Sequence, residues 1–176
     1  MKVRVDELPD VGRVIHFHKA EAWLASLTEN DREITLAKPV EVDLELIPEA
    51  DSIKLKGHLR GALQLVCSRC LQEFVLDLDE TIDLTLLRHP SADAPYEIDL
   101  RPEDLDTEFF DGVTIDVDLI VAEQIFLALP QRPLCKTDCA GICSGCGADL
   151  NRETCRCEKI DRISAFDALR SVKIEH

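Results

Sequence analysis

Residues 53–86 read IKLKGHLRGALQLVCSRCLQEFVLDLDETIDLTL, and apolar residues alternate with polar ones along most of this segment. The apolar residues occupy odd positions from Ile53 to Leu65 and even positions from Phe74 to Leu86. A period of two is typical of a half-buried β-strand, with one face on a core and the other in solvent. The segment therefore predicts two long antiparallel strands joined by a turn that carries Cys67 and Cys70.

A third strand is predicted just before this hairpin, over residues 40–46. Its even positions are Val or Leu, whereas its odd positions are Glu41, Asp43 and Glu45, which gives the strand one acidic face. Gly57 and Gly61 lie inside the first strand of the hairpin. They indicate either bulges and sharp coiling in a barrel-like sheet, or small residues beneath a packed side chain.

The remaining segments predict helices and short strands around this sheet. A short helix is expected over residues 18–27, and short strands over residues 96–100 and 112–117. Asp118 is expected to cap a buried helix over residues 119–129 that Pro130 ends. A final helix is expected from Asp161. The fold class is thus α+β, with an acidic antiparallel β domain over residues 1–130 and a cysteine-rich tail over residues 131–176.

The chain has eight cysteines, and six of them lie between residues 135 and 157. A Cys-x2-Cys turn lets backbone amides approach both sulfurs while these face one ion, and zinc prefers four such ligands in structural sites. One zinc site is expected from the tail alone and a second from the hairpin and the tail together, which would clip the tail onto the hairpin. The ligand sets are Cys143, Cys146, Cys155 and Cys157, and Cys67, Cys70, Cys135 and Cys139.

Other uses of the cysteines are weighed against these two sites. Partitions such as Cys135 and Cys139 with Cys143 and Cys146 remain open. An iron–sulfur cluster is disfavoured because the spacings match neither common ferredoxin pattern. Redox chemistry at the hairpin pair is disfavoured because a thioredoxin-like motif should open a helix after a strand. His89 lies in an Arg-His-Pro turn, and a role there as a spare metal ligand is disfavoured.

The charge of the chain is strongly uneven. The net charge is -15; residues 1–130 hold 12 Lys and Arg against 28 Asp and Glu, whereas residues 131–176 hold 8 against 7. Nucleic-acid affinity depends on cations that neutralise phosphates, so the acidic part suits basic proteins better than RNA. A basic face on the tail keeps direct RNA contact open as an alternative, through Arg152, Arg156, Lys159 and Arg162.

The cysteine-bearing segments resemble the YceD family. The tail reads Leu-Pro, a cysteine, then Cys-x-Gly-Ile-Cys-x2-Cys-Gly-x-Asp-Leu-Asn and Cys-x-Cys, and the hairpin reads Cys-x-Arg-Cys-Leu. Asp149 and Ile142 depart from the Asn and Leu usual in the family. The resemblance implies a bacterial protein linked to the accumulation of large-subunit ribosomal RNA by an unresolved mechanism. Some members of the family lack the tail cysteines but keep the hairpin pair, so the resemblance implies that metal supports the fold without being the shared function.

Together these observations predict a non-enzymatic accessory factor in ribosome biogenesis. Its partners are expected to be ribosomal proteins or large-subunit assembly intermediates, held through the acidic sheet face. A closed site of four cysteines leaves no position for a reactive water, which argues against an enzyme. Zinc or redox handling is a further alternative. The chain shows neither a signal peptide nor an apolar run that could span a membrane, so a cytoplasmic location is expected.

Overall fold

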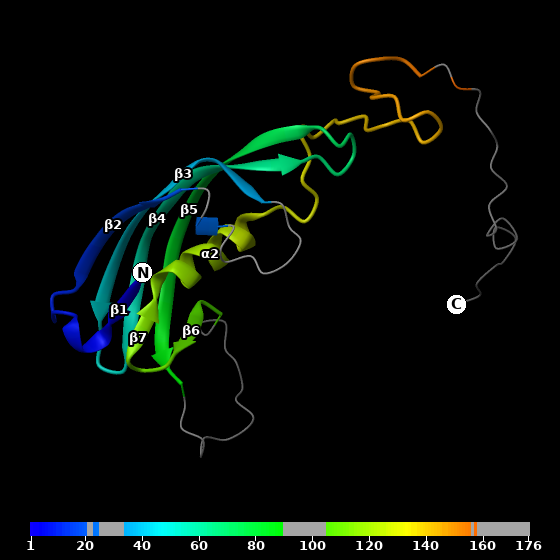
Figure 1. Cartoon of the computed structure of the whole chain (residues 1–176). Coiled ribbons are helices and arrows are strands. Elements are labelled where there is room, and N and C mark those ends of the chain that lie inside the picture. Colours follow the sequence, from blue (N-terminus) through cyan, green and yellow to red (C-terminus); the bar gives the residue numbers. More distant parts are fainter. Residues whose placement is uncertain (21–22, 25–33, 90–104, 156, 158–176) are drawn as a thin grey trace, which may run out of the picture.

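One long, twisted sheet dominates the protein (Figure 1). The computed structural model describes residues 1–20, 23–24, 34–89, 105–155 and 157. The strand order is β2-β3-β4-β5-β6, and every neighbouring pair is antiparallel except β5 with β6. The strands are β2 (Arg13–Lys19), β3 (Thr35–Pro48), β4 (Ser52–Val66), β5 (Glu73–Arg88) and β6 (Thr107–Phe110).

A small second sheet and a helix complete the described fold. Strand β1 (Lys2–Arg4) pairs with β7 (Thr114–Asp116), and the 3-10 helix η1 (Val5–Glu7) follows β1. The helix α2 (Val117–Ala128) continues directly from β7 and lies against one face of the large sheet (Figure 1). This is an α+β arrangement, as predicted.

The β4–β5 hairpin confirms the alternation read from residues 53–86. Its register runs from Ile53 opposite Leu86 to Val66 opposite Glu73. The residues of apolar parity face the helix and form the core with residues of β3 and α2. The largest fully buried side chains are Leu24, Val40, Val42, Leu44, Leu46, Leu55, Leu59, Leu63, Ile82, Leu86, Ile115 and Ile125.

The sheet is open, so the barrel-like prediction is wrong. Strands β2 and β6 end the sheet and do not pair with each other in the described part of the chain. The last strand has only four residues and runs parallel to β5. Closing a barrel requires the two edges to share hydrogen bonds at a consistent tilt. Here α2 covers the inner face of the sheet.

Gly57 marks a close approach of two backbones. A Cβ at Gly57 would collide with the backbone oxygen of Asp43 on β3 and lie 2.8 Å from Leu44 Cδ2. A Cβ at Gly61 would lie 3.1 Å from the Val40 side chain. The register shifts lie between Leu36 and Glu41 on β3, opposite the second half of β4. The irregularity therefore belongs to β3 and lies opposite Gly61, whereas Gly57 pairs with Leu44 in a regular stretch of the ladder.

The start of α2 differs from the prediction. The helix begins at Val117, so its N-cap is Asp116, which makes no side-chain cap hydrogen bond, and Asp118 lies in the first turn. Instead, the Asp118 carboxylate accepts a 2.9 Å hydrogen bond from Lys19 Nζ, which ties the helix to β2. The helix is buried on one face only, since Leu119 is 50% exposed and Leu127 is 76% exposed. It ends before Pro130, as predicted.

Other predicted elements fall partly or wholly beyond the described residues. Of the helix expected over 18–27, His18 and Lys19 belong to β2, and only Trp23 and Leu24 are described as helical. The strand over residues 96–100 and the helix from Asp161 lie outside the described residues. In the described part of the chain, no helix is long and apolar enough to cross a membrane.

A half-buried carboxyl on β6, next to Glu123 of α2, predicts a pH dependence of stability. Burial, and after it the neighbouring Glu123 carboxyl, together raise the pKa of Glu108 to about 7. A raised folded-state pKa favours the protonated form, so its stabilisation is complete below about pH 4.5 and is lost as the pH rises through about 7. Glu108→Gln should therefore increase the melting temperature at about pH 8 and change it little at about pH 4.5.

Circular dichroism melts of both chains at the two pH values measure this difference. Asp138→Asn, at an exposed carboxylate in the tail, is the matched control and should shift neither melt. A Glu108→Gln effect of equal size at both pH values would contradict the assignment, because it would not depend on ionisation.

Candidate metal centres

The first cysteine group joins the hairpin tip to the tail. Cys67 and Cys70 lie in the turn between β4 and β5, and Cys135 and Cys139 come from the segment after α2. The Sγ atoms of Cys67 and Cys139 are 3.8 Å apart, and those of Cys70 and Cys135 are 3.6 Å apart. We call these four residues the inner group, because three of them are buried and the fourth is half-buried.

The second cysteine group lies within the tail alone. Its members are Cys143, Cys146, Cys155 and Cys157, and we call it the outer group. Cys155 Sγ lies 3.2 Å from Cys143 Sγ and 3.6 Å from Cys146 Sγ. Cys146 and Cys157 are exposed, whereas the other two are half-buried.

The spacing of the sulfurs suits a tetrahedral ion. In each group all four Sγ atoms lie within 4.8 Å of one another. A tetrahedron with metal–sulfur bonds of about 2.3 Å has edges of about 3.8 Å, close to the distances found in both groups. The sulfurs are too far apart for disulfides, whose S–S bond is about 2.05 Å. The donor set therefore fits zinc, with one group for each ion.

The two Cys-x2-Cys turns share one backbone geometry. Leu71 N–H donates to the Cys67 carbonyl at 2.9 Å, and Gly147 N–H donates to the Cys143 carbonyl at 2.8 Å. Both residues have positive φ, 60° for Leu71 and 77° for Gly147. Glycine adopts this conformation without steric cost. Leucine rarely adopts this conformation, and the Leu71 side chain is 62% exposed.

Hydrogen bonds fasten the tail to the hairpin tip around the inner group. Ser68 N–H donates to the Pro133 carbonyl at 2.8 Å, and Ile142 N–H donates to the Arg69 carbonyl at 3.1 Å. The Arg69 guanidinium donates to the Cys139 carbonyl at 2.9 Å. Figure 1 shows the tail passing the end of the β4–β5 hairpin, where these contacts form.

A comparison with known protein families covers both the hairpin and the tail. A family model described as "Large ribosomal RNA subunit accumulation protein YceD" matches residues 55–173, which include all eight cysteines. The chain belongs to the YceD family. Its hairpin tip and tail thus lie within a single family match, and the resemblance drawn from the two motifs is confirmed.

Individual relatives of the family are distant and longer. A protein of Arabidopsis thaliana named "Large ribosomal RNA subunit accumulation protein YCED homolog 1, chloroplastic" is 22% identical over 88% of this chain and 55% of its own length. A Zea mays protein of the same name is 23% identical over 79% of this chain and 55% of its own. An uncharacterised protein of Mycobacterium leprae is 25% identical over 79% of this chain and 62% of its own.

This YceD-family chain therefore spans little more than half the length of the curated relatives that it matches. No solved structure matches it.

Charge in the inner group is divided unevenly among its thiols. Burial raises the pKa of Cys67, but backbone N–H groups of Cys135, Cys70 and Arg69 outweigh burial and leave that pKa at about 6. Burial and neighbouring thiols raise the pKa of Cys135 to about 12. Without a cation the group therefore resists holding four negative charges, and a bound divalent ion would remove that penalty.

The outer group shows the same division. Three hydrogen bonds lower the pKa of Cys143 to about 6: the largest comes from the Cys146 backbone N–H, and the others come from the Cys155 thiol and the Gly145 N–H. Hydrogen bonding with Cys146 and Cys155 raises the pKa of Cys157 to about 12. One thiolate is stabilised and another is suppressed, because four thiolates this close repel one another when no cation lies between them.

Sequence reasoning overlooked two residues of these centres. Arg69 bridges hairpin and tail, and Asn151 Nδ2 lies 3.5 Å from Cys139 Sγ while its Oδ1 accepts a hydrogen bond from Ala140 N–H at 2.9 Å. No ligand-spacing rule points to Arg69 or Asn151. Both residues occur in the family motifs, which are the one sequence signal that could have identified them. His89 stacks on Phe109 and belongs to neither group.

Of the four basic residues proposed for RNA, only Arg152 lies in the described part of the chain. It is exposed, lies 3.5 Å from an Asp149 carboxylate oxygen, and donates to Gln72 Oε1 at 3.3 Å. Its guanidinium thus helps to hold the tail on the hairpin. Arg156, Lys159 and Arg162 lie outside the described residues.

Proposed function

We propose that this chain is a non-enzymatic accessory factor for the accumulation of large-subunit ribosomal RNA, built around two structural zinc ions and acting through protein contacts in the cytoplasm. The observation that carries the proposal is the YceD family match, which covers the hairpin tip and the tail together. The relatives named for the same process, in Arabidopsis thaliana and Zea mays, support the link to ribosomal RNA.

Zinc is the ion that suits both cysteine groups. Four thiolates in a closed tetrahedron are typical of structural zinc, and each bound ion would act as a cross-link. The inner group would hold residues 67–70 to residues 135–139, and the outer group would hold the tail in its own fold. No ligand position remains for a substrate or an activated water, so the ions would support binding surfaces.

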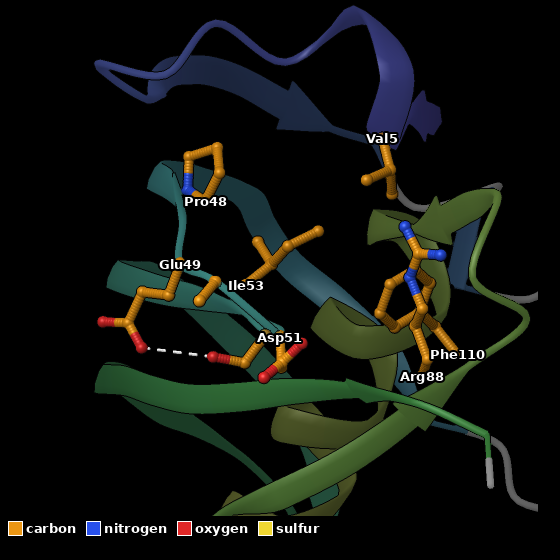
Figure 2. Close-up of a pocket in the computed structure, with 9 residues that line it drawn as sticks. Val5, Pro48, Glu49, Asp51, Ile53, Arg88 and Phe110 are labelled. Carbon is orange, nitrogen blue, oxygen red and sulfur yellow. Dashed lines mark hydrogen bonds between the residues drawn. The ribbon is translucent and has the colours of Figure 1, made fainter.

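A cleft lies at the end of the sheet away from the cysteine groups (Figure 2). It encloses about 290 Å³ beside the β3–β4 turn, next to Arg88 and Phe110. The Glu49 carboxylate in this turn accepts a 3.1 Å hydrogen bond from Ser52 Oγ. The carboxylate therefore closes the turn, as the dashed line in Figure 2 shows.

Protein contacts would use the outer face of the sheet, which carries many charged side chains, only some of them in ion pairs. Three of its carboxylates, all on β5, face cations on β3 or β4, whereas Glu41 and Glu45 form no ion pair within the described residues. A net charge of -15 would attract a basic protein over long range, in a way that salt weakens. The paired contacts are Lys38–Asp77, Lys56–Asp83 and Arg60–Asp79.

Deleting the gene in its native host tests the process. We expect the ratio of large-subunit to small-subunit ribosomal RNA to fall, and the intact gene to restore it. An unchanged ratio during growth would contradict the proposed function. A restored ratio with a variant that lacks all eight cysteines would contradict only the structural role of zinc.

Binding assays test the contacts. The zinc-loaded chain should bind separated large-subunit ribosomal proteins, and raising salt from about 50 mM to about 300 mM should weaken binding about tenfold. Glu41→Gln with Glu45→Gln should weaken it further, whereas Asp77→Asn, at a carboxylate already paired with Lys38, serves as the matched control. Equal or tighter binding to protein-free large-subunit RNA would support the RNA alternative instead.

A further inference from the structure

The two cysteine groups differ sharply in their access to solvent. In the inner group, Cys67 is 0% exposed, Cys139 is 2% and Cys70 is 3%. Phe74 and Leu134 pack against this group. In the outer group, Cys146 and Cys157 are both exposed. Small reagents would therefore reach the outer sulfurs without any opening of the sheet domain.

A glycine keeps the outer sulfurs uncovered. A Cβ at Gly145 would lie 3.6 Å from Cys157 Sγ and 3.8 Å from Cys143 Sγ, so any side chain there would stand over two of the four sulfurs. Gly145 is not among the glycines with positive φ, so the backbone does not require glycine at this position. The absent side chain leaves an approach to the thiolates.

We propose that the outer group is a reversible oxidation site, at which hydrogen peroxide converts Cys143, Cys146, Cys155 and Cys157 into two disulfides and releases their metal ion, while the inner group keeps its own. This inference rests on the proposed zinc binding. Metal-bound thiolates remain nucleophilic toward peroxides when solvent reaches them, and burial protects them.

The chemistry balances with peroxide as the only oxidant. Each peroxide molecule accepts two electrons from two thiolates, takes up two protons, and leaves two water molecules and one S–S bond. Two peroxide molecules therefore oxidise all four thiolates. The ion then has no thiolate ligand left in the group and departs as a free divalent cation.

The geometry also favours one pairing. Cys155 Sγ lies closer to Cys143 Sγ, at 3.2 Å, than to Cys146 Sγ, at 3.6 Å, which leaves Cys146 to pair with Cys157. The alternative of Cys155 with Cys157 closes a very small ring, which conflicts with preferred disulfide geometry. The expected products are thus Cys143–Cys155 and Cys146–Cys157.

The effect of oxidation would be confined to the tail. The outer group takes no residue from the sheet, and the hairpin keeps its own contacts to the tail through Arg69 and Ser68. The sheet domain and the contacts between hairpin and tail at the inner group would thus remain folded, while the surface around the outer group changes. Reduction with fresh zinc would reverse the change.

The experiment uses the full chain purified under reducing conditions. Elemental mass spectrometry first gives the metal content; two zinc ions per chain establish the starting state, and none would overturn the proposed zinc binding and this inference together. Hydrogen peroxide is then added with a chromophoric zinc chelator. We expect one ion to be released at least about tenfold faster than the other.

Peptide mapping after alkylation should find Cys143–Cys155 and Cys146–Cys157 disulfides, and dithiothreitol with zinc should restore both ions. Gly145→Val should slow the fast release severalfold because a side chain then covers two sulfurs, and Val113→Ala, at an exposed residue of the sheet domain, should not. Release of both ions at one rate, or loss of the inner ion first, would overturn the oxidation site while leaving zinc binding intact.

Discussion

Replacing Cys67 with serine should reduce the zinc content from about two ions per chain to about one and detach the tail from the hairpin. Cys67 is fully buried and contributes one of the four sulfurs of the inner group. Three remaining thiolates bind zinc far more weakly, and the ion is lost. Elemental mass spectrometry of the zinc-loaded variant measures the first effect.

The loss of the inner ion should also destabilise the protein. Cys70 and Cys135 are 65 residues apart in sequence, so an ion between them closes a long loop. By analogy with a disulfide across a loop of this length, the cross-link contributes about 4 kcal/mol to the free energy of unfolding. Thermal melts should therefore show a much lower midpoint, and limited proteolysis should cut near Pro130.

Cys146→Ser is the matched control, because it removes one sulfur from the outer group instead. This variant should also hold about one zinc ion, but the melting temperature of its sheet domain should stay close to that of the parent chain. Equal destabilisation by both substitutions would contradict the claim that the inner ion cross-links the hairpin to the tail. Two retained ions in Cys67→Ser would contradict the assignment of Cys67 as a ligand.

Gly57→Ala should destabilise the sheet more than any other substitution in β4 that adds or removes one methyl group. The new Cβ would overlap the Asp43 backbone oxygen, which cannot move without breaking the β3–β4 ladder. Relief requires a shift of the β3 strand or of Gly57 itself, at a cost of about 4 kcal/mol. Urea unfolding, followed by far-UV circular dichroism, measures the difference.

Gly61→Ala supplies the comparison on the same strand. Its Cβ would lie 3.1 Å from Val40 Cγ2 and 3.3 Å from Val40 Cα, a contact that a small adjustment relieves. We expect a cost of about 1 kcal/mol. Similar costs for the two glycines would show that the close approach at Gly57 does not constrain the sheet. Both variants should keep their zinc, since neither residue contacts a cysteine group.

The structure also shows which carboxylates of the outer sheet face remain available to a basic partner. Along the outer sheet face, the register sets Lys38, Lys56 and Arg60 beside the carboxylates of β5, which the alternation of a single strand does not show. Such exposed pairs add little stability, but they neutralise much of the face. The unpaired carboxylates Glu41 and Glu45 are therefore the better targets for testing contacts with a basic partner.

Several features were accessible from sequence because they are local. The alternation over residues 53–86 predicts the β4–β5 hairpin, and Pro130 correctly marks the end of α2. The start of α2 was misplaced because Asp118 looks like a cap, whereas its carboxylate binds Lys19 from a distant strand. The barrel-like prediction failed because two interior glycines in a strand do not reveal whether the sheet edges meet.

The amino-acid sequence alone specifies the strands, the Cys-x2-Cys turns and the family, since each depends on residues close together in the chain. It leaves open which four of the eight sulfurs share a site, because several partitions satisfy the same spacings. Folding resolves that choice: the tail passes the hairpin tip, so Cys135 and Cys139 meet Cys67 and Cys70 instead of Cys143 and Cys146. The same packing buries the inner group and leaves the outer one in solvent, because burial depends on contacts between segments that lie far apart in the sequence.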